Sequence, residues 1–328
     1  MSMPTVIVTH RLPPGWLAPL EGKCRLIVGP ETREHSGLTG ALRARLGEAD
    51  GLFSLLTVRV DEALLAAATG LKVVSNMAVG VDNVDLEACT RRGIPVGNTP
   101  GVLTEGTADL TMALLLAVAR KLPQASRDAR EGRWTTWLPD GWLGADLPGA
   151  TLGIVGMGKI GAAVAERARP FGVRIVYTSR APKPDVEARL GAERLPLEDL
   201  LRTSDFVTLH VPLAAETRGM IDEAALRLMK PSAILINVAR GPVVDAAALE
   251  RALREGSVAA AGLDVTDSEP LPPEHPLYAL DNCFIVPHIG SATQETRRRM
   301  AARACENLLA GLEGRRLPFC ANPDVYGR

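Results

Sequence analysis

The sequence predicts an α/β protein built from two doubly wound parallel sheets. Short apolar segments alternate with helical patterns almost from end to end, which is typical of parallel sheets covered by helices on both faces. The 328 residues are enough for two domains that each bury a core. A glycine-rich turn of the kind that often opens such a sheet begins only about halfway along the chain, so a complete α/β unit precedes it.

The apolar runs and helical periods place the elements in order. In the first hundred residues we expect strands at 6–8, 25–28, 51–54, 73–76 and 95–97, with helices at 38–46 and 61–67. A long helix over 105–120 leads to further strands at 153–155, 173–177, 206–210, 233–237, 259–263 and 284–286. The simplest packing returns the last helix, 294–312, to the first sheet. We therefore expect a discontinuous, flavodoxin-like domain of residues 1–103 and 287–328 and a Rossmann-like domain of residues 104–286.

Composition and charge exclude several classes of protein. The formal net charge is −1, and the densest basic run, at 297–299, is typical of one solvated face of a helix rather than of a nucleic-acid surface. The five cysteines have no metal-type spacing, so we expect reduced thiols and no metal site. No apolar run is long enough for a transmembrane helix, and the amino terminus does not resemble a signal peptide. These observations favour a cytoplasmic protein that binds neither membranes nor nucleic acids.

The glycine-rich turn has the pattern Gly-x-Gly-x-x-Gly at residues 156–161, between a strand and a helix. Gly156 allows a tight turn, Gly158 lets the backbone approach a pyrophosphate, and Gly161 allows close packing of the helix on the strand. The helix amino terminus favours an anion. The turn therefore predicts a dinucleotide site.

The end of the next strand predicts which dinucleotide binds. NAD sites usually place an acidic residue there for the ribose 2′-hydroxyl, but this chain has no acid before Asp185. Ser179, Arg180 and Lys183 could instead bind a 2′-phosphate. We expect a preference for NADP(H), with NAD(H) possible.

Three polar residues follow strands in the second half of the chain. Arg240 could hold a substrate carboxylate through two parallel hydrogen bonds. His288 could donate a proton to a ketone oxygen as hydride arrives, and Glu269 could orient the imidazole and favour its charged form. Behind a dinucleotide site, this set predicts reduction of a 2-oxo acid.

The segment 123–148 has no clear periodicity and contains Trp134, Trp137 and Trp142. Exposed aromatic residues in an irregular segment indicate an arm that is buried against another subunit. We expect a homodimer, with a loop folded on its own domain as the alternative.

Motifs along nearly the whole chain resemble those of the D-isomer-specific 2-hydroxyacid dehydrogenases. The likeness within that family is closest to glyoxylate/hydroxypyruvate reductases. The residues that carry the family resemblance are 156–161, 210–213 with 217, 236–241, 261–265, 269–270 and 287–291. Those that point to glyoxylate/hydroxypyruvate reductases are 76–82, 134–137 and 177–184.

The resemblance implies roles for individual residues. It makes Arg240, Glu269 and His288 the catalytic residues. The substrate would contact Arg240 and His288 and also Leu55, Val79, Gly80, Ser291 and Trp142. The cofactor would contact Thr107, Gly156, Gly158, Lys159, Ile160, Gly161, Ser179, Arg180, Lys183, His210, Val211, Pro212, Thr217, Val238, Ala239, Asp264 and Gly290. Asp264 would accept a hydrogen bond from the nicotinamide carboxamide.

The implied activity is reduction of glyoxylate and hydroxypyruvate to glycolate and D-glycerate. One alternative is another D-2-hydroxyacid dehydrogenase, such as one acting on 3-phosphoglycerate. Such an enzyme would need extra cations for the phosphate, and only Arg59 stands near residues 55–58. The other alternative is a dinucleotide-sensing scaffold of the C-terminal-binding corepressor type, for which the chain shows no long disordered tail.

Overall fold

The computed structural model describes residues 3–33 and 36–327, and its contacts divide the chain into two compact units. The first unit is Met1–Leu103 with Thr293–Arg328, and the second is Thr104–Ala292. The chain therefore returns to the first unit after residue 292. The sequence had placed this boundary after residue 286. The reason is local, because the turn after the last strand of the second sheet is hydrogen-bonded to Asp264 of that sheet.

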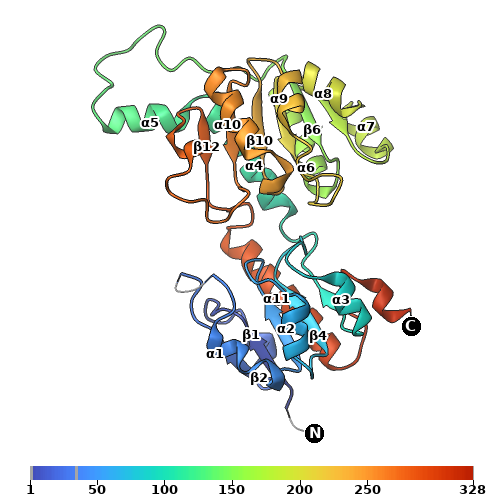
Figure 1. The fold of residues 1–328 in the computed structure, drawn as a ribbon. Helices are drawn as coiled ribbons and strands as arrows, with labels where there is room; N and C mark the ends of the chain where they lie inside the picture. The colour runs from blue at the N-terminus through green and yellow to red at the C-terminus, as the bar shows by residue number, and fades with distance from the viewer. Residues whose placement is uncertain (1–2, 34–35, 328) are drawn as a thin grey trace. The chain divides into compact units, whose positions relative to one another are not determined.

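The first unit holds a five-stranded parallel sheet in the order β2-β1-β3-β4-β5, the flavodoxin-like order (Figure 1). Its strands are β1 (Thr5–Val8), β2 (Arg25–Val28), β3 (Gly51–Ser54), β4 (Val73–Asn76) and β5 (Val96–Gly97). Its α-helices are α1 (Gly40–Arg43), α2 (Glu62–Ala67), α3 (Leu86–Arg91) and α11 (Gln294–Leu312). Short 3-10 helices are η1 (Ala18–Leu20), η2 (Leu46–Glu48) and η6 (Pro323–Tyr326).

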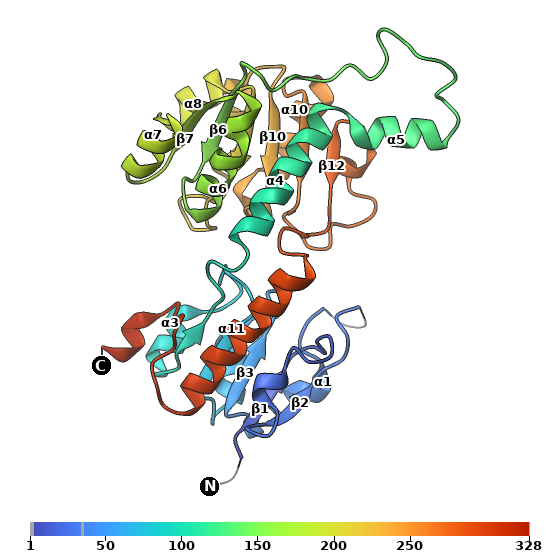
Figure 2. The same ribbon diagram turned by 180° about the vertical axis from the view of Figure 1, so that it is seen from behind.

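Alternate residues of each buried strand face opposite layers of this unit. Ile7 packs in the layer of α1, α2 and α3, whereas Val6 packs in the layer of α11. Helix α11 lies close against its face of the sheet, as Figure 2 shows. A Cβ atom on Gly311 of this helix would stand 2.6 Å from Cβ of Val73, so the approach requires glycine.

The second unit holds a seven-stranded parallel sheet in the order β12-β11-β10-β9-β6-β7-β8. Its strands are β6 (Thr151–Val155), β7 (Arg174–Thr178), β8 (Glu193–Arg194), β9 (Phe206–Leu209), β10 (Ile234–Asn237), β11 (Ala260–Leu263) and β12 (Cys283–Ile285). Its α-helices are α4 (Thr104–Ala119), α5 (Leu122–Arg130), α6 (Lys159–Ala168), α7 (Pro184–Leu190), α8 (Leu197–Thr203), α9 (Glu223–Leu228) and α10 (Ala246–Glu255). Short 3-10 helices are η3 (Arg169–Phe171), η4 (Gly241–Val243) and η5 (Pro276–Ala279).

Helices cover both faces of this sheet. Helices α4, α6 and α7 bury their apolar residues on one face, and α8, α9 and α10 do so on the other (Figures 1 and 2). The sheet order reverses between β9 and β6, and ligands of such folds bind at the carboxyl ends of the strands beside that point. The prediction of two doubly wound α/β domains is confirmed.

The sequence suggested that the segment 123–148 is irregular throughout, but the structure shows a helix in it. Helix α5 occupies its first part, and a loop without helix or strand follows to residue 150. None of the residues of α5 is buried. No helix in the described part of the chain has the length and apolarity needed to cross a membrane.

Candidate active site

The glycine-rich turn between β6 and α6 forms an open cradle. Gly156 has a φ of +101°, and a Cβ atom there would stand 2.8 Å from the carbonyl carbon of His210. A Cβ on Gly161 would stand 2.3 Å from the oxygen of Gly156, whereas nothing lies within 4 Å of the corresponding position on Gly158. The turn is therefore packed against backbone atoms at Gly156 and Gly161, whereas the space beside Gly158, at the amino terminus of α6, is open. These residues, with Lys159 and Ile160 in the first helical turn, fit a dinucleotide pyrophosphate.

The end of β7 carries the residues predicted to select the cofactor. Ser179 and Lys183 are half-buried, and Arg180 is exposed. The hydroxyl of Ser179 donates to the carbonyl of Ala181 at 2.6 Å, so it must rotate before it can donate to a ligand. Two acids lie in the first turn of the following helix, the exposed Asp185 and Glu187, whose carboxylate accepts the hydroxyl of Tyr177. The end of β7 itself carries no carboxylate, the residue that NAD sites usually place there for the ribose 2′-hydroxyl.

The end of β9 contributes a neutral histidine. Burial lowers the pKa of His210 to about 3, so its ring is uncharged near neutrality. Its Nε2 lies 3.1 Å from the Thr208 hydroxyl, and its Nδ1 is buried without a hydrogen-bond partner among the described residues. Val211 is half-buried and Pro212 exposed beside it. Thr217 donates to the carbonyl of Pro212 at 2.6 Å and so closes this loop on itself.

The turn after β10 is shaped by Asn237. Its side chain accepts from the N–H of Ala239 at 3.0 Å and donates to the carbonyl of Arg240 at 2.9 Å. Val238 and Ala239 are buried, and the half-buried Arg240 donates from one guanidinium nitrogen to the carbonyl of Ala239 at 2.8 Å.

This turn also packs against the loop that follows β11. A Cβ on Gly241 would stand 1.9 Å from the carbonyl carbon of Thr266, so the two backbones touch. The contact holds the loops of Arg240 and Glu269 together at one sheet edge.

Glu269 and His288 are hydrogen-bonded. The imidazole Nδ1 of His288 lies 2.6 Å from Oε2 of Glu269, and Oε1 of Glu269 accepts from the N–H of Thr266 at 3.3 Å. Both side chains are about two-thirds to three-quarters buried, with exposed fractions of 26% for His288 and 32% for Glu269. One ring nitrogen is thus anchored, which leaves Nε2 as the atom that can exchange a proton with a ligand.

Asp264 holds the turn that carries His288. Its carboxylate accepts from the N–H groups of Ile289 at 2.6 Å and Gly290 at 2.8 Å, and its carbonyl accepts from the N–H of His288 at 2.9 Å. His288 has a φ of +52°, a strained value for a residue with a side chain. Thr107 on α4 adds a bond to the carbonyl of Gly290 at 3.2 Å.

These contacts make Asp264 the clamp of the His288 turn. Burial raises the pKa of Asp264, and the two N–H donors oppose that shift. Ser291 lies at the end of the same turn, half-buried. Its contact with substrate, and that of Asp264 with the carboxamide, stay predictions.

In the first unit, the three predicted substrate residues lie at the carboxyl edge of the sheet. Leu55 follows β3, and Val79 and Gly80 follow β4. Their carbonyls accept hydrogen bonds from asparagine side chains. The pairs are Asn83 with Leu55 at 3.3 Å, Asn98 with Val79 at 2.8 Å and Asn76 with Gly80 at 3.1 Å. Because a trans peptide directs C=O and N–H oppositely, the N–H of Gly80 points away from Asn98.

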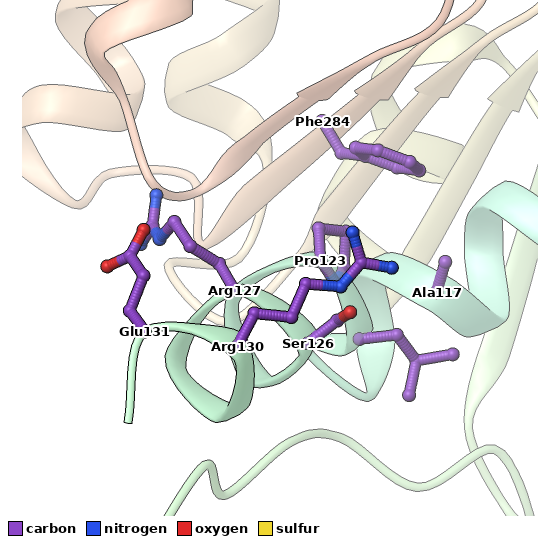
Figure 3. A pocket seen from close by; sticks show the side chains of 8 residues that line it. Ala117, Pro123, Ser126, Arg127, Arg130, Glu131 and Phe284 are labelled. Carbon is purple, nitrogen blue, oxygen red and sulfur yellow. The ribbon is translucent and has the colours of Figure 1, made fainter. Parts of the chain in front are cut away.

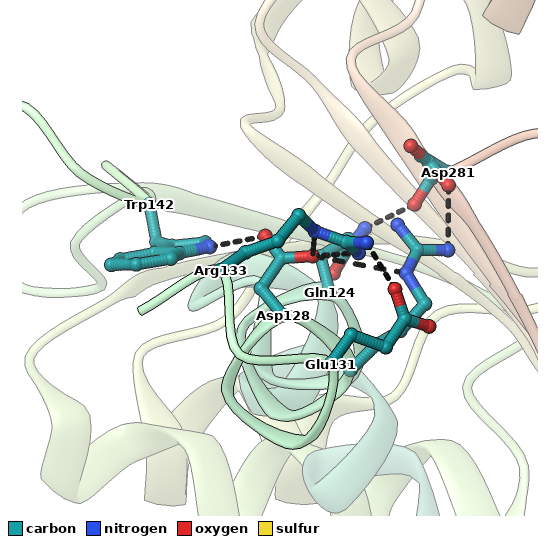
Figure 4. A network of polar contacts seen from close by, with 7 residues as sticks. Gln124, Asp128, Glu131, Arg133, Trp142 and Asp281 are labelled. Carbon is teal, nitrogen blue, oxygen red and sulfur yellow. Dashed lines mark hydrogen bonds and ion pairs between the residues drawn. The ribbon is translucent and has the colours of Figure 1, made fainter. Parts of the chain in front are cut away.

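The arm leaves most of its aromatic surface uncovered. Trp137 is 80% exposed and Trp134 63% exposed, with Leu138 and Leu143 also exposed. Trp142 differs, because its Nε1 donates to Asp128 of α5 at 2.8 Å (Figure 4). Arg133 also binds Asp128, and Arg127 pairs with Asp281 at 2.8 Å. The structure therefore ties Trp142 to its own arm, and its contact with a neighbouring subunit's substrate stays a prediction.

A cavity of about 450 Å³ opens beside α5. Pro123, Ala117 and Phe284 face it, with the hydrocarbon part of Arg130 alongside (Figure 3). The cavity shares no residue with the glycine cradle.

Sequence reasoning missed the residues that position the site. Asn83 and Asn98, the clamp function of Asp264 and the contacts of Arg194 beside Ser179 all came from the structure. Asn98 had one available signal, since it follows β5 directly and an amide just after a strand often satisfies loop backbone.

Comparisons with known proteins agree with this geometry. The family model described as D-isomer specific 2-hydroxyacid dehydrogenase, NAD binding domain, matches residues 112–290. The glyoxylate reductase of Aeropyrum pernix is 49% identical over 99% of this chain and 98% of its own length. A solved structure of a Thermus thermophilus protein is 50% identical, with a TM-score of 0.88 over 97% of this chain and 99% of that one.

A second solved structure is the NADPH-dependent glyoxylate/hydroxypyruvate reductase of Sinorhizobium meliloti in complex with NADP and malonate. It is 34% identical, with a TM-score of 0.85 over 98% of each chain. The prediction of an oxidoreductase that acts on a CH–OH group with a nicotinamide dinucleotide is confirmed. By the family model and by identity along nearly its whole length, this chain belongs to the D-isomer-specific 2-hydroxyacid dehydrogenases.

Proposed function

We propose that this protein reduces glyoxylate and hydroxypyruvate to glycolate and D-glycerate, with NADPH as the preferred hydride donor. The observation that carries the proposal is the Glu269–His288 pair, joined at 2.6 Å in the same unit as the glycine cradle. The relatives named glyoxylate reductase support the choice of substrate. We place the enzyme in the cytoplasm, as the unpaired state of its five cysteines supports.

Three side chains of the second unit share the remaining chemical roles with the bound dinucleotide. The bound dinucleotide supplies the hydride. Arg240 holds the substrate carboxylate with two parallel hydrogen bonds, which fixes the direction of the carbonyl. His288 gives a proton from Nε2 to the carbonyl oxygen, while Glu269 holds Nδ1 and stabilises the charged ring before the transfer.

The preference for NADPH rests on the end of β7. Ser179, Arg180 and Lys183 offer a hydroxyl and two cations, and no carboxylate repels a 2′-phosphate there. The Sinorhizobium meliloti relative, described as NADPH-dependent and solved with NADP, supports the same choice.

A substrate panel tests the proposal. We expect kcat/KM for glyoxylate and hydroxypyruvate to exceed that for 3-phosphohydroxypyruvate and longer 2-oxo acids, and to be higher with NADPH than with NADH. The measurement is steady-state turnover with each acid and each cofactor. A preference for NADH of about tenfold or more, equivalent to 1.4 kcal/mol, would contradict the cofactor choice. Turnover of none of these acids would contradict the activity.

We also propose that the arm makes the protein a homodimer. Two exposed tryptophans and an open apolar cavity beside α5 are a surface that a second copy could cover. A double change of Trp134 and Trp137 to serine should raise the dimer Kd by about 1000-fold or more, because buried interface aromatics contribute about 2 kcal/mol or more each. Analytical ultracentrifugation measures the effect.

The matched control is Phe171→Ser, an aromatic residue of the same unit that is 40% exposed and lies outside the arm. It should leave the dimer intact. A monomeric wild type, or an equal weakening of the dimer in Phe171→Ser, would contradict the proposal and favour an arm that folds on its own domain.

A further inference from the structure

The turn that follows β7 is held by an arginine from the neighbouring strand. Strands β7 and β8 pair so that Arg194 lies opposite Tyr177, which brings its side chain to residues 179–181. The guanidinium donates to the carbonyl of Ser179 from Nη2 at 2.9 Å and from Nε at 3.3 Å. The same nitrogen, Nη2, also donates to the carbonyl of Arg180 at 3.3 Å. One planar side chain thus binds two consecutive carbonyls.

This contact fixes the direction of two N–H groups. Because a trans peptide places its C=O and N–H on opposite sides, the N–H groups of Arg180 and Ala181 point away from Arg194. Neither donates a backbone hydrogen bond within residues 3–33 and 36–327. Successive N–H groups directed outward from a turn are an anion-binding arrangement.

The other end of the turn is anchored independently. The hydroxyl of the fully buried Tyr177 accepts from the N–H of Lys183 at 2.7 Å and donates to Glu187. Arg194 and Tyr177 therefore hold the turn from its two ends, so that its backbone keeps one conformation.

The charge around the turn is positive. Arg180, Lys183 and Arg194 surround it, and their side chains make no ion pair within the described part of the chain. Two of the three acids on neighbouring elements are engaged, since Glu187 binds Tyr177 and Glu193 pairs with Arg174, and the third, Asp185, is exposed at the start of α7.

We propose that Arg194 is a positioning residue for cofactor selection, which orders the Ser179–Ala181 turn so that its N–H groups and side chains receive the 2′-phosphate. The proposal rests on the proposed preference for NADPH. Arg194 acts through the two carbonyls and not as a direct ligand. This requires the fork of a guanidinium, because the single charged group of lysine cannot bind both carbonyls in one plane.

The test measures Kd for NADPH, NADH, 2′,5′-ADP and 5′-AMP by titration calorimetry in wild type, Arg194→Met and Arg194→Lys. Arg194→Met should lower the selectivity for the 2′-phosphate, taken as the ratio of the NADH and NADPH Kd values, by about tenfold, the effect of one lost charge-assisted hydrogen bond. Arg194→Lys should recover little of it. The matched control is Arg174→Met, which removes a cation of the same strand pair that binds Glu193 and not the turn. Its selectivity should stay within about twofold of wild type.

Three results would overturn the proposal. If Arg194→Lys keeps the wild-type selectivity, Arg194 contributes only its charge. If Arg194→Met lowers the affinities for NADPH and NADH equally and also lowers Tm, the role of Arg194 is structural only. An equal loss of selectivity in Arg174→Met would show that the effect comes from the loss of any nearby positive charge and not from the contact of Arg194 with the turn. A wild type that does not prefer NADPH would contradict the proposed function itself. A wild type that prefers NADPH and an Arg194→Met variant with the same selectivity would contradict only the role of Arg194.

Discussion

Changing His288 to alanine should lower kcat for glyoxylate reduction by about 10²- to 10⁴-fold, the usual contribution of general acid catalysis. The affinity for NADPH should change little, because the glycine cradle belongs to a different turn of the second unit. Stopped-flow rates of NADPH oxidation and Kd by fluorescence titration give the two quantities. Glu269→Gln keeps an acceptor for Nδ1 but removes the charge that stabilises the imidazolium, so its kcat should fall by a smaller factor.

The control for this change is His275→Asn. His275 accepts from the N–H of Leu277 at 3.3 Å at the start of η5, and asparagine can serve as the same cap. A loss of kcat in this control as large as in His288→Ala would remove His288 from the chemistry.

Changing Arg240 to alanine should raise KM for the 2-oxo acid by about 100-fold or more. Two hydrogen bonds between charged groups are lost, each contributing about 1.5–3 kcal/mol. Arg240→Lys should rescue little, because a point charge cannot reproduce two parallel bonds. Steady-state kinetics with saturating NADPH measure KM.

Arg251→Ala is the matched control for Arg240. Arg251 lies on α10 of the same unit and pairs with Glu223 at the surface, so its loss should leave KM within about twofold of wild type. Near-wild-type KM in Arg240→Ala would place the substrate carboxylate elsewhere.

The fold was largely predictable because its buried strands are continuous apolar runs. The predicted segments 25–28, 51–54 and 73–76 coincide with β2, β3 and β4. Strand β8 was missed because it has two residues, Glu193 and Arg194, and both are exposed. Helix α5, which buries no side chain, was also missed. A sequence pattern reports burial, so elements without burial leave no such signal.

The residues that carry the proposed chemistry could be named from the sequence, whereas most residues that hold their turns in place could not. The motifs named Glu269 and His288, which the structure joins at 2.6 Å. The contacts of Arg194 with Ser179 depend on the β7–β8 register, which no local pattern contains. The clamp of Asp264 on residues 289 and 290 likewise joins segments that are 25 and 26 positions apart in the chain.

The most direct test of the central claim, that His288 donates the proton in reduction, is the pH dependence of both reaction directions in one preparation. Reduction needs the protonated imidazole and oxidation of the hydroxy acid needs the neutral one. In the wild type, kcat/KM for reduction should therefore fall as pH rises, whereas kcat/KM for oxidation should rise across the same interval. Both limbs should disappear from the residual activity of His288→Ala. If the two opposite limbs persist unchanged in that variant, another group donates the proton and the account is wrong.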